Sequence, residues 1–208
     1  MASQISSVIF DLGRVLIDFD HWIAARKLAV LTDKSPQELY NLFFDSRLVQ
    51  SFEEGKISPQ NFFQKVREML NLKIEFEEFV PLWSGIFFLT EENKAVYHLA
   101  KRLHNRYKVA LLSNVNALHF DYIKKNFPIF DGFHHIFTSY ELGFIKPHPM
   151  IYQKVLDKLG IEPNEAFYVD DRAELVSEAN KLGIRGFVFN GVEQLKKDLA
   201  SCGVKCDA

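Results

Sequence analysis

The chain has few of the features that mark secreted, membrane-spanning or disulfide-stabilised proteins. Its only cysteines are Cys202 and Cys206, close together near the C-terminal end, and two neighbouring thiols make neither a disulfide framework nor a complete metal site. No apolar stretch approaches the about 20 residues that cross a bilayer, and the short polar N-terminus shows no signal peptide. We therefore expect free thiols, no membrane partner and a cytoplasmic location.

The chain also lacks an excess of either charge. Its 208 residues carry a net charge of −2, and the lysines and arginines are scattered along the sequence, which argues against nucleic acid as a partner. Hydrophobic residues make up 48% and charged residues 25%, as in ordinary soluble globular proteins. The length fits a core domain with a smaller insertion, and nothing in the sequence favours a monomer over a homodimer.

Short apolar runs recur along the chain and stop abruptly at polar or glycine residues. Such runs are typical of strands that are buried on both faces of a parallel sheet. Segments with helical periodicity alternate with them, and two of these segments stop at Gly160 and Gly183, which suit helix C-termini. The alternation predicts an α/β fold with a doubly wound, mainly parallel sheet. The predicted strands contain residues 8–10, 109–112, 136–137, 167–169 and 187–189.

Residues 20–84 interrupt this alternation. They contain no buried-strand run, but they contain repeated helix starts, such as Ser35-Pro36 with Glu38 three positions after the serine, and Ser58-Pro59 before an apolar helical stripe. We therefore predict an all-helical insertion over residues 20–84, and a core domain made of residues 1–19 and 85–208.

Polar side chains follow the predicted strands at the edge where ligands of open α/β sheets bind. Asp11 follows the first run, Ser113 the second, and the adjacent carboxylates Asp170 and Asp171 follow a later one, while Lys146 precedes a helix. Each residue alone is more often a turn former, a helix cap or an exposed side chain. Adjacent carboxylates repel each other, however, and a bound cation compensates for that repulsion.

The ordered set resembles the haloacid dehalogenase (HAD) superfamily over nearly the whole chain. Residues 8–13 (VIFDLG), 111–114 (LLSN), 143–147 (GFIKP) and 168–172 (YVDDR) are similar to its four motifs. The helical insertion stands where the C1 cap of the family stands, and residues 52–58 are similar to its substrate-facing loop. The first motif with the residues that follow it most resembles the branch that contains bacterial α-D-glucose-1-phosphate phosphatases.

The resemblance implies a Mg²⁺-dependent phosphomonoester hydrolase that acts on a small phosphorylated metabolite, such as a sugar phosphate, through an aspartyl-phosphate. Mg²⁺ and a lysine would neutralise the repulsion between a carboxylate nucleophile and a phosphate dianion. The implied catalytic residues are Asp11, Ser113 and Lys146. The implied phosphate-binding residues are Leu12, Gly13, Ser113, Asn114 and Lys146. The implied metal ligands are Asp11, Gly13 through its carbonyl, Asp170 and Asp171. The candidate substrate-facing cap residues are Trp22, Glu53 and Lys56.

Two positions depart from the family pattern. The aspartate that protonates the leaving group usually stands two residues after the nucleophile, and here that position is Gly13. Loss of such an acid typically lowers the rate by about 10²–10⁴-fold. The conceivable substitute donors are Asp18, Asp20, His21 and His148. The polar residue often found four positions beyond the metal-binding aspartate is here Leu175, with Glu174 one residue short.

Two other functions stay open at this point. One is a metal-independent haloacid dehalogenase, in which Asp11 displaces halide; the Asp170-Asp171 pair argues against it, because that chemistry requires no cation. The other is a catalytically impaired binding protein that kept the fold and lost turnover with Gly13. Retention of Asp11, Ser113 and Lys146 argues against the latter.

Overall fold

A parallel β-sheet forms the centre of the computed structural model, which describes residues 4–43 and 46–206. Its five strands lie in the order β5-β4-β1-β6-β7, and every pair of neighbours is parallel. The α/β fold with a parallel sheet that the sequence predicts is confirmed. The strands are β1 (Ser7–Phe10), β4 (Lys108–Ser113), β5 (His135–Thr138), β6 (Ala166–Asp170) and β7 (Arg185–Val188).

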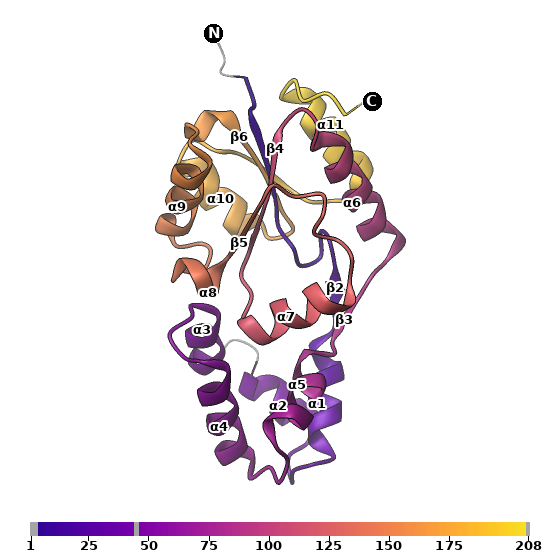
Figure 1. Cartoon of the computed structure of the whole chain (residues 1–208), viewed down its shortest axis with the longest axis vertical. Coiled ribbons are helices and arrows are strands. Elements are labelled where there is room, and N and C mark those ends of the chain that lie inside the picture. Colours follow the sequence, from indigo (N-terminus) through magenta and orange to yellow (C-terminus); the bar gives the residue numbers. More distant parts are fainter. Residues whose placement is uncertain (1–3, 44–45, 207–208) are drawn as a thin grey trace.

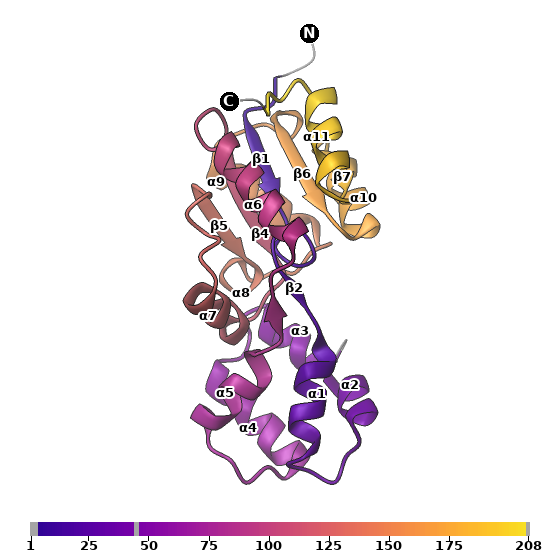
Figure 2. The same ribbon diagram turned by 90° about the vertical axis from the view of Figure 1, so that its right-hand side faces the viewer.

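Helices cover both faces of this sheet (Figure 1, Figure 2). Successive strand residues point to opposite faces: Val8 and Phe10 pack in one hydrophobic cluster, and Ile9 packs in the other. The first cluster contains side chains of α6 (Glu91–Leu103) and α11 (Val192–Ser201). The second contains side chains of α9 (Pro149–Leu159) and α10 (Ala173–Lys181). Burial on both faces explains why the strands read as continuous apolar runs.

The remaining core elements are short or lie at the ends of strands. They are α7 (Ala117–Asn126), α8 (Ser139–Leu142) and the 3₁₀ helix Pro163–Glu165. Helix α9 ends as predicted, with Gly160 as its left-handed C-cap at φ 65°. Within the described residues, no helix is long and apolar enough to cross a membrane.

The helical unit between β1 and α6 has a hydrophobic core of its own, in which Phe43, Phe62, Phe79 and Trp83 are buried. Its helices are α1 (His21–Ala29), α2 (Pro36–Phe43), α3 (Arg47–Glu53), α4 (Pro59–Leu70) and α5 (Phe76–Ser84). These helices fall in the range 20–84 for which the sequence predicts a helical insertion; the division into two domains stays a prediction.

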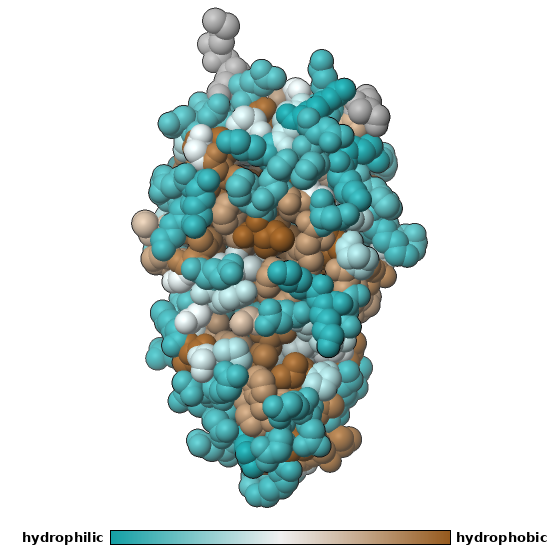
Figure 3. Space-filling view, in the orientation of Figure 1, coloured by the Kyte–Doolittle hydropathy of each residue, from teal (hydrophilic) through white to brown (hydrophobic). Residues whose placement is uncertain are grey.

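A short antiparallel pair, β2 (Asp18–Phe19) with β3 (Phe87–Phe88), joins the helical unit to the sheet. The sequence did not predict this pair, since two-residue strands carry no periodicity. It places the helices beyond the carboxyl ends of the parallel strands (Figure 1). The face seen in Figure 3 is mainly hydrophilic, with patches of hydrophobic side chains over both the core and the helical unit.

A second contact between helical unit and core lies at α8. The Ser139 hydroxyl donates to the carbonyl oxygen of Glu53 at 2.6 Å and accepts from the Val115 amide at 3.0 Å. Gly55 lies against the same helix, and a Cβ on Gly55 would stand 2.1 Å from the carbonyl oxygen of Tyr140. The turn after α3 therefore requires glycine for space as well as for its φ of +69°.

We predict that Gly55→Ala destabilises the protein more than Gly160→Ala does. Both glycines have similar positive φ values, +69° and +65°, but a Cβ on Gly160 meets nothing within 4 Å. In the control, Gly160→Ala, the free energy of unfolding should fall only by the backbone cost of about 1–2 kcal/mol. In Gly55→Ala, the new Cβ also clashes with the backbone of α8 and displaces the turn. Urea unfolding of both variants measures the difference, and equal losses of unfolding free energy would contradict the contact.

Candidate active site

A cavity of about 490 Å³ lies between the carboxyl ends of the sheet and the helical unit. Core loops line one side of it, and Tyr40, Gln50, Glu53 and Trp83 of the helical unit line the other. The residues predicted from the motifs all border this cavity: Asp11, Leu12, Gly13, Ser113, Asn114, Lys146, Asp170 and Asp171.

The order of the strands brings these residues together. Strand β1 lies between β4 and β6, and Phe10 is in register with Leu111 on one side and Val169 on the other. The next polar residues along these three strands are Asp11, Ser113 and Asp170. These residues therefore share one edge of the sheet.

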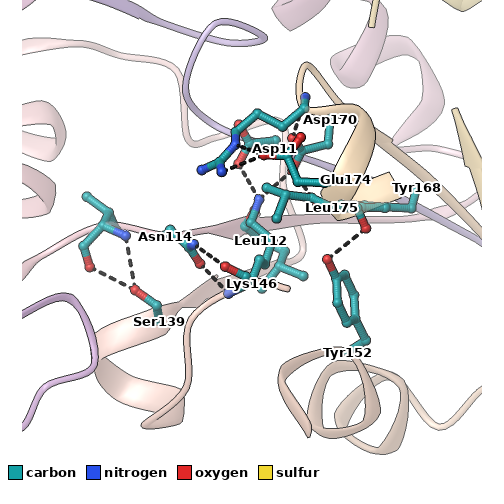
Figure 4. A network of polar contacts seen from close by, with 12 residues as sticks. Asp11, Leu112, Asn114, Ser139, Lys146, Tyr152, Tyr168, Asp170, Glu174 and Leu175 are labelled. Carbon is teal, nitrogen blue, oxygen red and sulfur yellow. Dashed lines mark hydrogen bonds and ion pairs between the residues drawn. The ribbon is translucent and has the colours of Figure 1, made fainter. Parts of the chain in front are cut away.

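Lys146 lies at the centre of the site, with its side chain 1% exposed. Its Nζ donates to Asp11 Oδ1 at 2.6 Å, to Asp170 Oδ2 at 2.7 Å and to the Leu112 carbonyl oxygen at 3.0 Å (Figure 4). All three ammonium hydrogens therefore have acceptors. The ammonium group holds the two carboxylates in a defined arrangement.

Asn114 fixes the backbone from which Lys146 extends. Its side-chain Oδ1 accepts from the Lys146 amide at 2.7 Å, and its Nδ2 donates to the Lys146 carbonyl oxygen at 2.9 Å. The side chain of Asn114 thus clamps the lysine loop. The prediction that Asn114 binds phosphate can be met by its backbone N–H or by the second Nδ2 hydrogen.

Asp170 is fully buried, and three donors hold its carboxylate. Besides Lys146, the Tyr168 hydroxyl donates to Oδ2, and the Arg172 amide donates to Oδ1 at 3.0 Å. The sequence places Tyr168 in a predicted strand and in the fourth motif, but it assigns no role to the hydroxyl group. Its spacing carried a signal, however, because residues two apart on a strand point to the same face.

Asp11, Asp170 and Asp171 bring carboxylate oxygens within 4.8 Å of one another. We call these residues together with Lys146 the acidic cluster. When all three carboxylates are ionised, the single ammonium group leaves two negative charges uncompensated within the cluster. A divalent cation matches both this charge and the oxygen donors. The residues present therefore fit a hard divalent metal ion.

The pKa shifts in the acidic cluster follow from burial and mutual charge. Burial raises the pKa of Asp11 to about 7, with Asp170 and Asp171 adding to the shift and Lys146 opposing it. Burial also raises the pKa of Asp171. Burial opposes ionisation of Asp170, but Lys146 outweighs it and lowers the pKa of that carboxyl. Burial likewise opposes the charge on Lys146, but Asp11 and Asp170 outweigh it and raise its pKa.

Gly13 faces an aromatic ring instead of carrying an acid. A Cβ on Gly13 would stand 2.9 Å from Phe19 Cε1. The ring of Phe19 in turn packs on His21, with centroids 4.8 Å apart, and the Arg14 guanidinium lies 4.5 Å above its centroid. Phe19 of β2 therefore fills the volume next to Gly13.

The predicted substrate-facing residues have different positions. Glu53 lines the cavity, but Trp22 and Lys56 are not among the described residues that line it. The Trp22 ring stacks on Tyr40 with centroids 4.4 Å apart, and the exposed Lys56 pairs with Glu54 at 2.6 Å. The sequence placed these side chains in the right unit and could not tell which way they point.

The fourth motif also departs from the family pattern in the structure. Leu175 lines the cavity as a buried apolar side chain. The exposed Glu174 accepts from Arg172 Nε at 2.7 Å, outside the acidic cluster. Neither residue adds a carboxylate to the acidic cluster.

The comparisons with known proteins agree with this geometry. Residues 5–183 match the sequence model of the haloacid dehalogenase-like hydrolase family. A D-ribitol-5-phosphate phosphatase of Bacteroides thetaiotaomicron is 27% identical over 88% of this chain and 91% of that protein. A sesquiterpene phosphatase of Aspergillus oryzae is 25% identical over 97% and 95%.

Among solved structures, a HAD-family enzyme of Bacteroides thetaiotaomicron in complex with magnesium and inorganic phosphate has a TM-score of 0.79 to this structure. The match has 28% sequence identity and covers 88% of this chain and 93% of that chain. Two phosphatases and this enzyme are therefore similar to the chain over nearly its whole length.

We predict that Asp11→Asn stabilises the cation-free protein, and more so as pH rises. The folded protein holds the Asp11 proton more tightly than the unfolded chain, so the stability that this proton contributes is lost as pH rises from the ordinary pKa of 3.8 to about 7. Asparagine has no proton to lose. Urea unfolding in EDTA at about pH 5 and about pH 8 measures the gain; a variant less stable than wild type at the higher pH would contradict it.

Proposed function

The chain is a phosphatase of the haloacid dehalogenase-like hydrolase family, and we propose that it hydrolyses phosphate monoesters of small polar metabolites with Mg²⁺ and an aspartyl-phosphate intermediate. The single observation that carries the proposal is the acidic cluster. A buried ammonium group there contacts the nucleophile Asp11 and its neighbour Asp170 at 2.6 and 2.7 Å.

We propose that Mg²⁺ is held by Asp11, the Gly13 carbonyl oxygen and Asp171, with Asp170 contributing through water. Asp170 already accepts from Lys146, Tyr168 and the Arg172 amide, which favours the indirect contact. When bound, the ion offsets the charge of the phosphate dianion. The relative with a solved structure is described as a complex with magnesium and inorganic phosphate, which supports this choice of ion.

The residues of the chain then divide the reaction between them. Asp11 attacks the phosphorus atom, and the ester oxygen leaves with its bonding pair and takes up a proton. Lys146 stabilises the charge on Asp11 and the phosphoryl group, and Ser113 with neighbouring backbone amides binds the phosphoryl oxygens. Water then attacks the aspartyl-phosphate, which releases inorganic phosphate and restores the Asp11 carboxylate.

The lining of the cavity supports a small substrate with hydroxyl groups. Its volume of about 490 Å³ lies in the range of small-molecule sites. Gln50 and Glu53 offer hydrogen bonds opposite the acidic cluster, and the rings of Tyr40 and Trp83 add aromatic lining. We propose a sugar or polyol phosphate; the narrower resemblance to α-D-glucose-1-phosphate phosphatases stays a prediction.

We predict that hydrolysis of p-nitrophenyl phosphate and of sugar phosphates requires Mg²⁺ and stops in excess EDTA. Asp11→Asn is expected to abolish turnover in both cases while it leaves the fold intact, since the amide cannot attack phosphorus. Steady-state phosphate release with circular dichroism checks both effects. Unchanged hydrolysis in EDTA would contradict the Mg²⁺ mechanism. Dehalogenation without metal would favour the dehalogenase, and wild-type protein without turnover would favour an impaired binding protein.

We also predict that Mg²⁺ binding releases a proton near neutral pH. In the absence of cation the pKa of Asp11 is raised to about 7, so part of the protein carries a proton there. A cation favours the carboxylate, so apparent Mg²⁺ affinity should increase as pH rises towards this value. Titration calorimetry in buffers of different ionisation enthalpy measures the release. Asp11→Asn is the control, and equal release from that variant would assign the proton elsewhere.

A further inference from the structure

The proposed reaction requires a proton for the departing alcohol, and Gly13 cannot supply it. The following inference rests on the proposed phosphatase function. It concerns which side chain replaces the missing acid among the candidates that the sequence left open, namely Asp18, Asp20, His21 and His148.

Three of these candidates have other roles in the structure and are not among the described residues that line the cavity. Asp18 pairs with Arg14 at 3.0 Å. Asp20 caps α1, where its side chain accepts from the Trp22 amide at 2.9 Å. His148 is an exposed cap of α9, whose Nδ1 accepts from the Met150 amide at 3.2 Å.

His119, the other histidine in the cavity lining, is excluded by its hydrogen bonds. Its amide donates to Asn116 Oδ1, which orients Asn116 Nδ2 to donate to His119 Nδ1 at 3.1 Å. His119 Nε2 then donates to the Trp83 carbonyl oxygen at 3.4 Å. Burial, with the charge of His21, lowers the pKa of His119 to about 3. This ring stays neutral and has a structural role.

Of the four candidates, His21 is the one whose residue lines the cavity. It is the first residue of α1, at the junction where the chain passes from the core into the helical unit, and it lines the cavity together with Asp11. The Phe19 ring lies next to both His21 and the loop after β1 that carries Asp11 and Gly13. A Cβ on Gly13 would touch that ring at 2.9 Å, and the imidazole packs on the ring at 4.8 Å between centroids.

We propose that His21 is the proton donor to the leaving group. Its imidazole packs on the same Phe19 ring that a Cβ on Gly13 would touch, and it lines the same cavity as Asp11. Histidine is also the side chain whose ordinary pKa allows proton exchange near neutrality. His119 of α7 interacts electrostatically with His21, and its neutral ring adds no second positive charge there.

The proton balance of the step is complete. As the Asp11 oxygen bonds to phosphorus and the ester P–O bond breaks, the imidazolium of His21 gives its proton to the ester oxygen, and the alcohol leaves neutral. The resulting imidazole accepts a proton from the water that attacks the aspartyl-phosphate. Inorganic phosphate leaves, and the imidazolium is restored.

The test compares His21→Gln with wild type on esters whose leaving groups differ in acidity. A nitrophenolate leaves without help, whereas an alkoxide needs a proton. We expect His21→Gln to keep kcat/KM on p-nitrophenyl phosphate within about threefold of wild type, while kcat/KM on an alkyl phosphate falls by about 10²–10⁴-fold. This ratio reports the steps through departure of the alcohol and leaves out the later attack of water. A plot of log kcat/KM against leaving-group pKa should steepen. His21→Asn should behave in the same way.

His98→Gln is the matched control, because His98 is exposed on α6 and is not among the described residues that line the cavity. Its leaving-group dependence should match wild type. Equal losses on both esters, or no loss on either, in a folded His21→Gln would overturn the donor role while the phosphatase function stands. A wild-type protein that hydrolyses neither ester with Mg²⁺ would overturn both.

Discussion

The site depends on one buried ammonium group. Lys146 is almost completely enclosed and contacts Asp11, Asp170 and the Leu112 carbonyl oxygen. Burying a charge is costly unless it is paired and its hydrogen bonds are satisfied. Here β4 and β6 and the end of β1, which lies between them, supply the three acceptors. The same contacts keep two carboxylates close together despite their repulsion. The negative charge that remains attracts a divalent cation, so the arrangement that satisfies the lysine also prepares the metal site.

The link between the sheet and the helical unit passes beside the loop that carries Asp11 and Gly13. Phe19 belongs to the short β2–β3 pair, yet its ring occupies the space next to Gly13 and supports His21. A Cβ on Gly13 would require this ring to shift. The segment that attaches the helical unit therefore occupies the space beside Gly13, and the imidazole at the start of α1 packs on the same ring.

The strands, one helix end and the polar edge of the sheet could be predicted from the sequence, because short local patterns of residues determine them. Apolar runs such as residues 8–10 predict buried strands, Gly160 predicts a helix end, and Asp11 at the end of a run predicts a polar sheet edge. The order of strands, the Asn114 clamp and the contact of Phe19 with Gly13 depend on residues far apart in the chain, where a single sequence has no periodic signal. The sequence also does not show which way a side chain points. Of the three predicted substrate-facing residues, Glu53 lines the cavity, whereas Trp22 and Lys56 do not.

Nucleophilic attack by Asp11 is the central claim, and trapping the covalent intermediate tests it most directly. The protein is mixed with Mg²⁺ and a ³²P-labelled sugar phosphate, quenched in acid during the first turnover, and digested for peptide mapping. The account predicts that the label resides on the peptide that contains Asp11 and disappears as phosphate is released. Label on a different residue, or hydrolysis that proceeds through the first turnover without any labelled protein, would contradict it.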